Sequence, residues 1–141
     1  PAGEPAWKAE VGILAVNVNP TGEGAAMPAV TAANEGAINI DEALKYVAEQ
    51  PENVLFVDVR DPDEFAAAHI TGAINVPVAS MEDEVFNLPT DKKIILTCAR
   101  GGRSGEAYDT AKLLMPELDV WFLNAITTYN ADGTIVATAV N

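Results

Sequence analysis

Residues 93–104 read KIILTCARGGRS, an apolar run that passes directly into a glycine-rich loop containing the chain's single cysteine. Residues 93–97 are typical of a short strand buried on both faces, because such a strand is apolar at consecutive positions. Over residues 104–115 the apolar side chains recur at the spacing of an amphipathic helix. The segment therefore predicts a strand, a loop and a helix in immediate succession.

The loop between this strand and helix has the composition of an anion-binding site. Gly101 and Gly102 permit positive φ and a close approach of several backbone N–H groups to one point. The N-terminus of the helix adds a positive dipole, and Arg100 and Arg103 add two guanidinium groups. Because such surroundings favour the thiolate, which is the nucleophilic form of cysteine, the sequence predicts a nucleophile at Cys98. The alternative is a turn with solvated arginines and an inert, buried cysteine.

Strand and helix patterns alternate through the rest of the chain. The helices are recognised by capping residues with Glu three positions later, and the strands by short apolar runs. In chain order we expect a helix from Asn39 to Pro51, a strand over 54–57, a helix over 61–68, a strand over 73–76, a helix over 80–86 capped by Ser80, and a strand over 120–123. This alternation predicts an α/β domain with a parallel sheet and helices on both faces. In such sheets the ligand binds beyond the carboxyl ends of the strands, where Cys98 falls.

Two segments lie outside this alternation. Residues 11–18 and 134–140 are apolar and partly alternating, which predicts two strands that pair with each other or extend a sheet edge. The alternative is a pair of poorly ordered tails. We therefore divide the chain into an N-terminal leader and loop over residues 1–37, a domain over residues 38–130, and a strand-like C-terminal extension over residues 131–141.

The composition excludes several classes of partner. The 141 residues suffice for the core of one domain, and 21 acidic against 8 basic residues give a formal net charge of -13. Such a charge repels nucleic acid and anionic membrane surfaces, and no apolar run approaches the ~18 residues of a membrane span. The small, weakly polar first residues fit a mature protein that has lost a signal peptide, so we expect a periplasmic or otherwise exported protein, with the cytoplasm as the alternative.

Three motifs in order and spacing identify a family resemblance. Residues 98–104, CARGGRS, fit C-x-x-G-x-R-S; residues 57–65, VDVRDPDEF, fit a strand end followed by a helix with E-F; and residues 69–77, HITGAINVP, fit H-I-x-G-A-x-N-V-P. Over about residues 38–130 the chain resembles the rhodanese family of single-domain sulfurtransferases. The resemblance implies a five-stranded parallel sheet flanked by helices on both faces.

The resemblance also implies a chemistry for the loop. Cys98 is the expected nucleophile, which takes sulfane sulfur from thiosulfate or polysulfide as a persulfide and passes it to a thiol, cyanide or a carrier protein. Arg103 is the second expected catalytic residue. The expected substrate-binding residues are Ala99, Arg100, Gly101, Gly102 and Ser104. Neither a metal nor an organic cofactor is required, and because the chain has no second cysteine, the acceptor must be another molecule.

Two other functions are alternatives to this one. The first is a low-turnover sulfur carrier or protein-interaction module whose acidic surface docks a basic partner. The second is a cysteine phosphatase or arsenate reductase. Cysteine phosphatases have their arginine six residues after the cysteine, whereas Arg103 lies five residues after Cys98. The shorter loop favours sulfur over a tetrahedral phosphate.

A few residues outside the loop complete the expectation. Asp58 and Arg60, at a strand end facing the same side as the cysteine, are expected either to support the loop or to form a surface ion pair of little energetic weight. His69 is expected to orient or pack rather than to act as a general base. The chain departs from the family's pattern at residues 124–125, where Asn-Ala replaces a usual Gly-Gly pair, and at Tyr129, where tryptophan is common. We expect these departures to alter the rim of the site.

Overall fold

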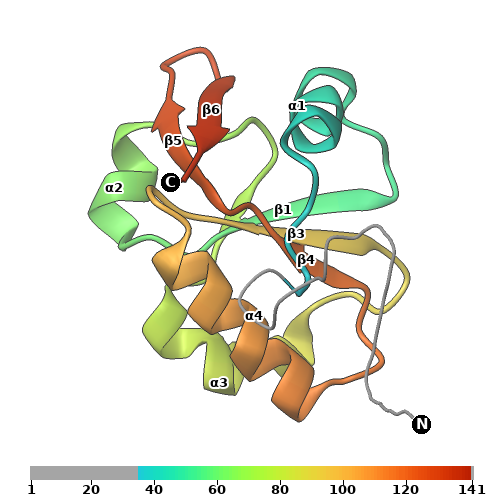
Figure 1. Cartoon of the computed structure of the whole chain (residues 1–141). Coiled ribbons are helices and arrows are strands. Elements are labelled where there is room, and N and C mark those ends of the chain that lie inside the picture. Colours follow the sequence, from blue (N-terminus) through green and yellow to red (C-terminus); the bar gives the residue numbers. More distant parts are fainter. Residues whose placement is uncertain (1–34, 141) are drawn as a thin grey trace, which may run out of the picture. The chain divides into compact units, whose positions relative to one another are not determined.

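The computed structural model describes residues 35–140 (Figure 1). Its elements are α1 (Ile40–Glu49), β1 (Val54–Asp58), α2 (Pro62–Ala67), β2 (Ile74–Asn75), η2 (Val78–Ser80), α3 (Met81–Glu84), η3 (Val85–Asn87), β3 (Lys93–Thr97), α4 (Gly102–Leu114), β4 (Val120–Phe122), β5 (Ala125–Tyr129) and β6 (Ile135–Ala139). The helix expected over 80–86 is thus a short α-helix between two 3-10 turns, and Ser80 makes no capping bond because its own backbone is already helical. The strand expected over 11–18 lies outside the described residues.

Four strands form one parallel sheet in the order β2-β1-β3-β4. Parallel neighbours need a crossover between them, and helices supply it here. Helices α3 and α4 lie on one face of the sheet and α1 lies on the other, as Figure 1 shows. The expected α/β architecture is confirmed.

Within the described residues this sheet has four strands, so the expectation of five was wrong. The segment beside β4 contributes a single parallel bridge, between Ala37 and Phe122. Two backbone bonds of 2.9 Å flank it, from Ile38 N–H to the Phe122 carbonyl and from Phe122 N–H to the Gly36 carbonyl. Gly36 takes a positive φ of 82° and Asn39 already caps α1, so the extended backbone between them is too short for a ladder.

The starts of α1 and α2 follow the capping residues that the sequence predicted. The Asn39 side chain accepts the Glu42 N–H at 3.1 Å and begins α1. At α2 the Glu64 carboxylate accepts the Asp61 N–H at 3.1 Å, as in a capping box. Glu42 does not reach back in the same way; it accepts the Tyr46 hydroxyl at 2.9 Å, since a residue four positions ahead shares its helix face.

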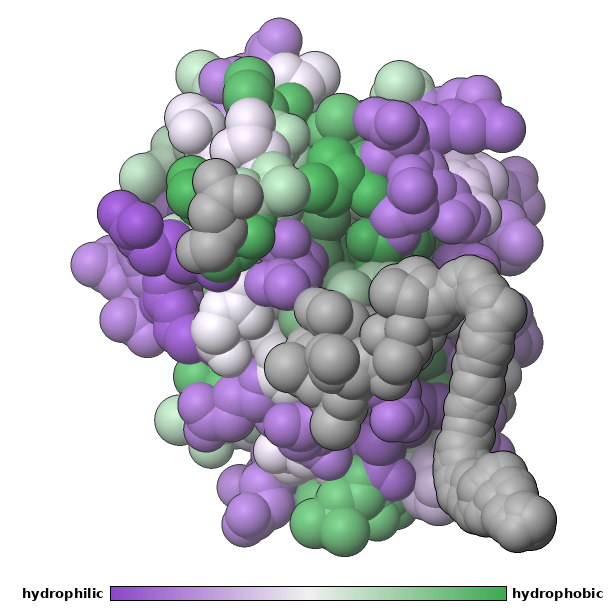
Figure 2. Space-filling view, in the orientation of Figure 1, coloured by the Kyte–Doolittle hydropathy of each residue, from purple (hydrophilic) through white to green (hydrophobic). Residues whose placement is uncertain are grey.

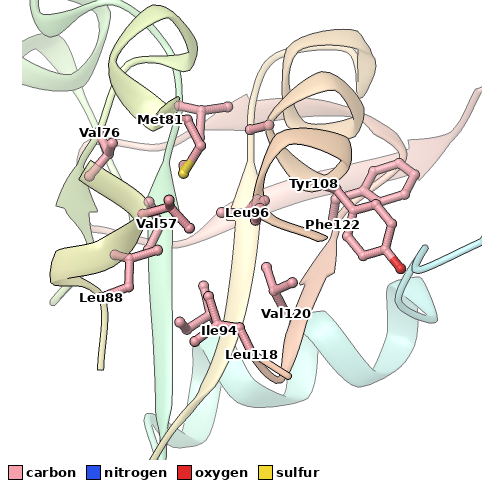
Figure 3. Packing of buried hydrophobic residues seen from close by; sticks show 14 of the residues in the cluster. Val57, Val76, Met81, Leu88, Ile94, Leu96, Tyr108, Leu118, Val120 and Phe122 are labelled. Atoms are coloured by element: carbon pink, nitrogen blue, oxygen red, sulfur yellow. The ribbon is translucent and has the colours of Figure 1, made fainter. Parts of the chain in front are cut away.

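Apolar side chains fill both faces of the parallel sheet. Successive strand residues alternate between two clusters, with Val57 and Leu96 facing α3 and α4 (Figure 3) and Phe56 and Ile95 facing α1. The side chain of Cys98 belongs to the first cluster and is 1% exposed. Packing in this cluster therefore fixes the position of the cysteine side chain.

Strands β5 and β6 form a separate antiparallel hairpin whose register pairs Ala125 with Ala139 and Tyr129 with Ile135. The predicted strand near the C-terminus is confirmed as β6, while β5 was not predicted. Gly133 turns the chain between them with a φ of 88°. Ile135 is buried against the side of α1, and Figure 2 shows apolar residues gathered between the hairpin and α1 on an otherwise largely hydrophilic face.

No helix among residues 35–140 has the length and apolar character needed to cross a membrane.

Candidate active site

The predicted loop lies at the carboxyl end of the parallel sheet. Cys98 directly follows β3, and α4 begins at Gly102, so only a few residues connect strand and helix. Gly101 makes this tight connection possible with a φ of 91°, a conformation that L side chains rarely adopt. A Cβ at this position would also collide with the side chain of Asn124. Asn124, one of the departures from the family pattern, therefore packs against the active loop.

Two backbone N–H groups point at the sulfur atom of Cys98. The Gly101 N–H lies 3.0 Å from Sγ and the Ser104 N–H lies 3.4 Å from it. The thiol itself donates to the Ser104 hydroxyl at 3.4 Å, and that hydroxyl is held by the carbonyls of Gly101 at 3.1 Å and Leu123 at 3.2 Å. Converging N–H groups of this kind stabilise negative charge on the atom at their centre. The loop is thus built to hold an anionic sulfur.

The two arginines of the loop differ in the contacts that they make. Arg100 is exposed and makes no hydrogen bond or ion pair with any other residue between 35 and 140. Arg103 is paired with Glu64 of α2 through contacts of 2.7 Å (Nη1 to Oε1) and 3.3 Å (Nη2 to Oε2). The Arg103 hydrogen bond lowers the pKa of Glu64, and the same bond raises the pKa of Arg103. The sequence pattern marks Glu64 only as the third residue after the cap Asp61, and it does not predict this contact.

A buried ion pair lies at the end of β1. The Nε and Nη2 groups of Arg60 donate to both carboxylate oxygens of Asp58 at 2.7–3.0 Å, and Nη2 also donates to the Ala68 carbonyl at 2.6 Å. Both side chains are almost fully buried, so the alternative of a surface ion pair does not apply. Removal of either partner from such a buried pair leaves the other charge buried and uncompensated, which is strongly destabilising. The pair therefore fixes the local structure.

Tyr129 connects this buried pair to the active loop. Its ring covers the guanidinium of Arg60 at 3.5 Å, and its hydroxyl donates to the backbone carbonyl of Cys98 at 3.2 Å. Burial raises the pKa of Tyr129 well above its ordinary value, so the hydroxyl keeps the proton that it donates. The sequence marked Tyr129 only as a departure from the family pattern, because nothing local shows which atom 31 residues away its hydroxyl meets.

A second contact from β5 ties the loop down. The Thr127 N–H donates to the Ala99 carbonyl at 2.8 Å. Strand β5 therefore holds two consecutive carbonyls of the loop, that of Cys98 through Tyr129 and that of Ala99 directly. Strand β5, which was not predicted, therefore forms one side of the site.

His69 lies against α2. Its ring stacks on Phe65 with the centroids 3.8 Å apart, and Nδ1 lies 2.7 Å from the Phe65 carbonyl. These contacts fit the packing role expected of this residue. Within the described part of the chain, no group of three His, Cys, Asp or Glu side chains could hold a metal ion.

Strand β3, the loop and α4 together define an α/β protein with a loop whose backbone N–H groups converge on a cysteine. A family model described as "Rhodanese-like domain" matches residues 39–130 of this chain. The chain belongs to the rhodanese-like domain family.

Individual relatives agree with this assignment. The thiosulfate:glutathione sulfurtransferase of Saccharomyces cerevisiae is 32% identical over 91 residues, which cover 55% of this chain and 66% of that protein. The putative sulfur carrier protein YrkF of Bacillus subtilis is 32% identical over 71 residues, which cover 50% of this chain and 38% of that protein. The crystal structure of a rhodanese-related protein from Thermoplasma volcanium superposes with a TM-score of 0.53 at 26% identity, covering 62% of this chain and 82% of that one. The chain thus spans only part of these relatives, and their names support sulfur transfer at the level of the family.

Proposed function

We propose that this protein is a sulfurtransferase that carries sulfur as a persulfide on Cys98. The observation that carries the proposal is the pair of N–H groups, from Gly101 and Ser104, that converge on Sγ. A persulfide has its negative charge on the outer sulfur, and a loop that donates to sulfur stabilises both the attacking thiolate and the loaded product.

The loading step needs no additional reagent. The Cys98 thiolate attacks the outer sulfur of a sulfane donor such as thiosulfate or polysulfide, and a new S–S bond forms as the donor's S–S bond breaks. Sulfite or a shortened chain leaves with the electron pair, so charge and atoms balance. Because Cys98 is the sole cysteine, the persulfide then passes its sulfur to an outside thiol, to cyanide or to a carrier protein.

The remaining loop residues have separate parts in this proposal. Arg100, exposed and unpaired within the described part of the chain, attracts the donor's oxyanion, and Arg103 supports the developing charge beside Cys98. Ala99, Gly101, Gly102 and Ser104 shape the backbone around the transferred sulfur. Asp58 and Arg60 support the loop through the Tyr129 ring. No metal or organic cofactor takes part in these steps.

A low-turnover sulfur carrier is the second candidate. Its support is the burial of Cys98, at 1% exposed, together with the acidic surface of the chain, since both suit delivery to a fitted partner more than to free small molecules. The two candidates share the loading step and differ in what releases the sulfur.

Cyanide-dependent formation of thiocyanate tests the proposal, with thiosulfate and polysulfide as donors and the protein's mass recorded after exposure to each. We expect a gain of one sulfur atom at Cys98 and turnover that Cys98→Ser abolishes. Loading without turnover would favour the carrier. If neither donor loads the protein, the sulfur proposal is wrong and phosphate or arsenate chemistry becomes the better hypothesis.

A further inference from the structure

The active loop has two arginines, but one of them is already neutralised. Arg103 is bound by both oxygens of Glu64, whereas Arg100 is unpaired within residues 35–140. We infer that Glu64 sets the charge class of the sulfur donor: by neutralising Arg103, it favours donors with one negative charge over the dianion thiosulfate. The inference rests on the proposed sulfur transfer at Cys98.

The position of Glu64 is fixed by a second contact. Its Oε1 atom also accepts the backbone N–H of Asp61, at the start of α2. The carboxylate is therefore anchored to the helix and presented to Arg103 rather than meeting it by chance. Both partners of the pair remain about one-third exposed, at 34% for Arg103 and 35% for Glu64. A donor that enters the loop can thus reach the same guanidinium and compete with Glu64 for it.

Arg103 lies in the first turn of α4, five residues after Cys98. The hydrogen bond from Glu64 raises its pKa most, and the negative charge of Cys98 adds to the effect. Two further carboxylates, Asp61 and Asp63, are exposed in the first turn of α2, and the charge of Asp61 also acts on Arg103. Of the two arginines, Arg100 is thus the one that Glu64 leaves unneutralised.

The negative charges around the loop repel donors of different charge to different extents. Coulomb energy scales with the product of the charges, so a dianion is repelled by Asp61, Asp63 and Glu64 about twice as strongly as a monoanion. A second arginine that is free to bind the donor would offset that repulsion. The pairing of Arg103 with Glu64 removes this offset. A thiosulfonate anion has the same sulfane sulfur as thiosulfate but one charge less. In its reaction the Cys98 thiolate takes the outer sulfur and a sulfinate leaves with the electron pair.

The charge at position 64 is tested with Glu64→Gln, which keeps an oxygen for the Asp61 N–H and removes the charge. Asp63→Asn is the matched control, because it removes one charge from the same helical turn without touching Arg103. With thiosulfate, Glu64→Gln is expected to lower KM by about two- to fivefold, the range that a partly exposed ion pair supports. The KM for methanethiosulfonate anion should fall by less. The gain should vanish in the double variant Glu64→Gln, Arg103→Gln.

A second readout does not require sulfur transfer. Cys98 is alkylated by the anion iodoacetate and by the neutral iodoacetamide, and the ratio of the two rates reports the charge around the sulfur. We expect Glu64→Gln to raise this ratio by more than Asp63→Asn does. A ratio equal to that of Asp63→Asn would overturn the inference. If wild-type protein transfers sulfur from no donor, the proposed function fails, and the alkylation ratio still decides whether Glu64 limits access of anions to Cys98.

Discussion

The hydroxyl of Tyr129 and the carbonyl of Cys98 meet at 3.2 Å, and this carbonyl belongs to the residue of the proposed nucleophile. The phenol ring is clamped on its face by Arg60, whose guanidinium is fixed in turn by Asp58. An unbroken series of contacts thus runs from the end of β1 to the backbone of the active loop. We interpret Tyr129 as a positioning residue, because it touches the backbone of Cys98 and not the sulfur.

Replacing Tyr129 with phenylalanine should separate positioning from packing. Tyr129→Phe keeps the ring over Arg60 and removes the hydrogen bond, which is worth about 1 kcal/mol and so corresponds to roughly a fivefold effect. We expect kcat to fall by about that factor while the KM for the donor stays near its wild-type value, in steady-state assays of thiocyanate formation. A fall in kcat no larger in Tyr129→Phe than in an exposed control, Thr128→Ser, would show that the hydroxyl has no part in positioning.

Whether a residue of the site could be predicted depends on how far along the chain it lies from the loop. Cys98, Gly101 and Ser104 could be predicted because strand, loop and helix are continuous and their N–H groups converge by local geometry. Glu64 and Tyr129 could not be predicted, since they reach the loop from 39 and 31 residues away and only the packing of the whole fold brings them there.

At the scale of elements, the strand pattern of β1 and β3 was readable because both strands are covered on two faces and so are apolar at consecutive positions, 54–57 and 94–96. Strand β2 is shorter than expected, with two paired residues, because it is an edge strand and Pro77 soon follows without an N–H to donate. Strand β5 escaped prediction because its partner is β6 alone, and a two-stranded hairpin leaves only a weak alternating pattern.

One face of β6 packs against the domain and adds to the contacts that β5 makes with the loop. Ile135 is 8% exposed and packs in the cluster that includes α1, whereas its neighbour Val136 is 56% exposed. We expect Ile135→Ala to lower the free energy of unfolding by about 2–4 kcal/mol, as for a buried aliphatic side chain cut to alanine. Val136→Ala should change it by less than about 0.5 kcal/mol. Urea unfolding measures both values, and equal losses in the two variants would mean that β6 does not pack as the structure shows.

At the scale of the whole molecule, the formal net charge of -13 opposes the approach of any anionic donor. Salt screens this field, with a Debye length that shortens from about 30 Å at ~0.01 M to about 10 Å at ~0.1 M ionic strength. We therefore expect kcat/KM for thiosulfate to rise by at least about twofold across that range.

The alkylation of Cys98 by neutral iodoacetamide is the control for this prediction, because the reagent has no charge to screen and its rate should stay nearly constant. A fall in kcat/KM for thiosulfate with added salt would have a different meaning. It would show that the local attraction of Arg100 outweighs the field of the whole chain.

The contacts of β5 with the loop also bear on the order in which the site is assembled during protein synthesis. During synthesis Cys98 leaves the exit tunnel well before Thr127 and Tyr129 do. These two later residues donate hydrogen bonds to the carbonyls of Ala99 and Cys98. The nascent thiol consequently emerges without its final surroundings, and the loop is locked only when the strand behind it has been translated. Residues 127–129 must therefore leave the exit tunnel before these two contacts can form.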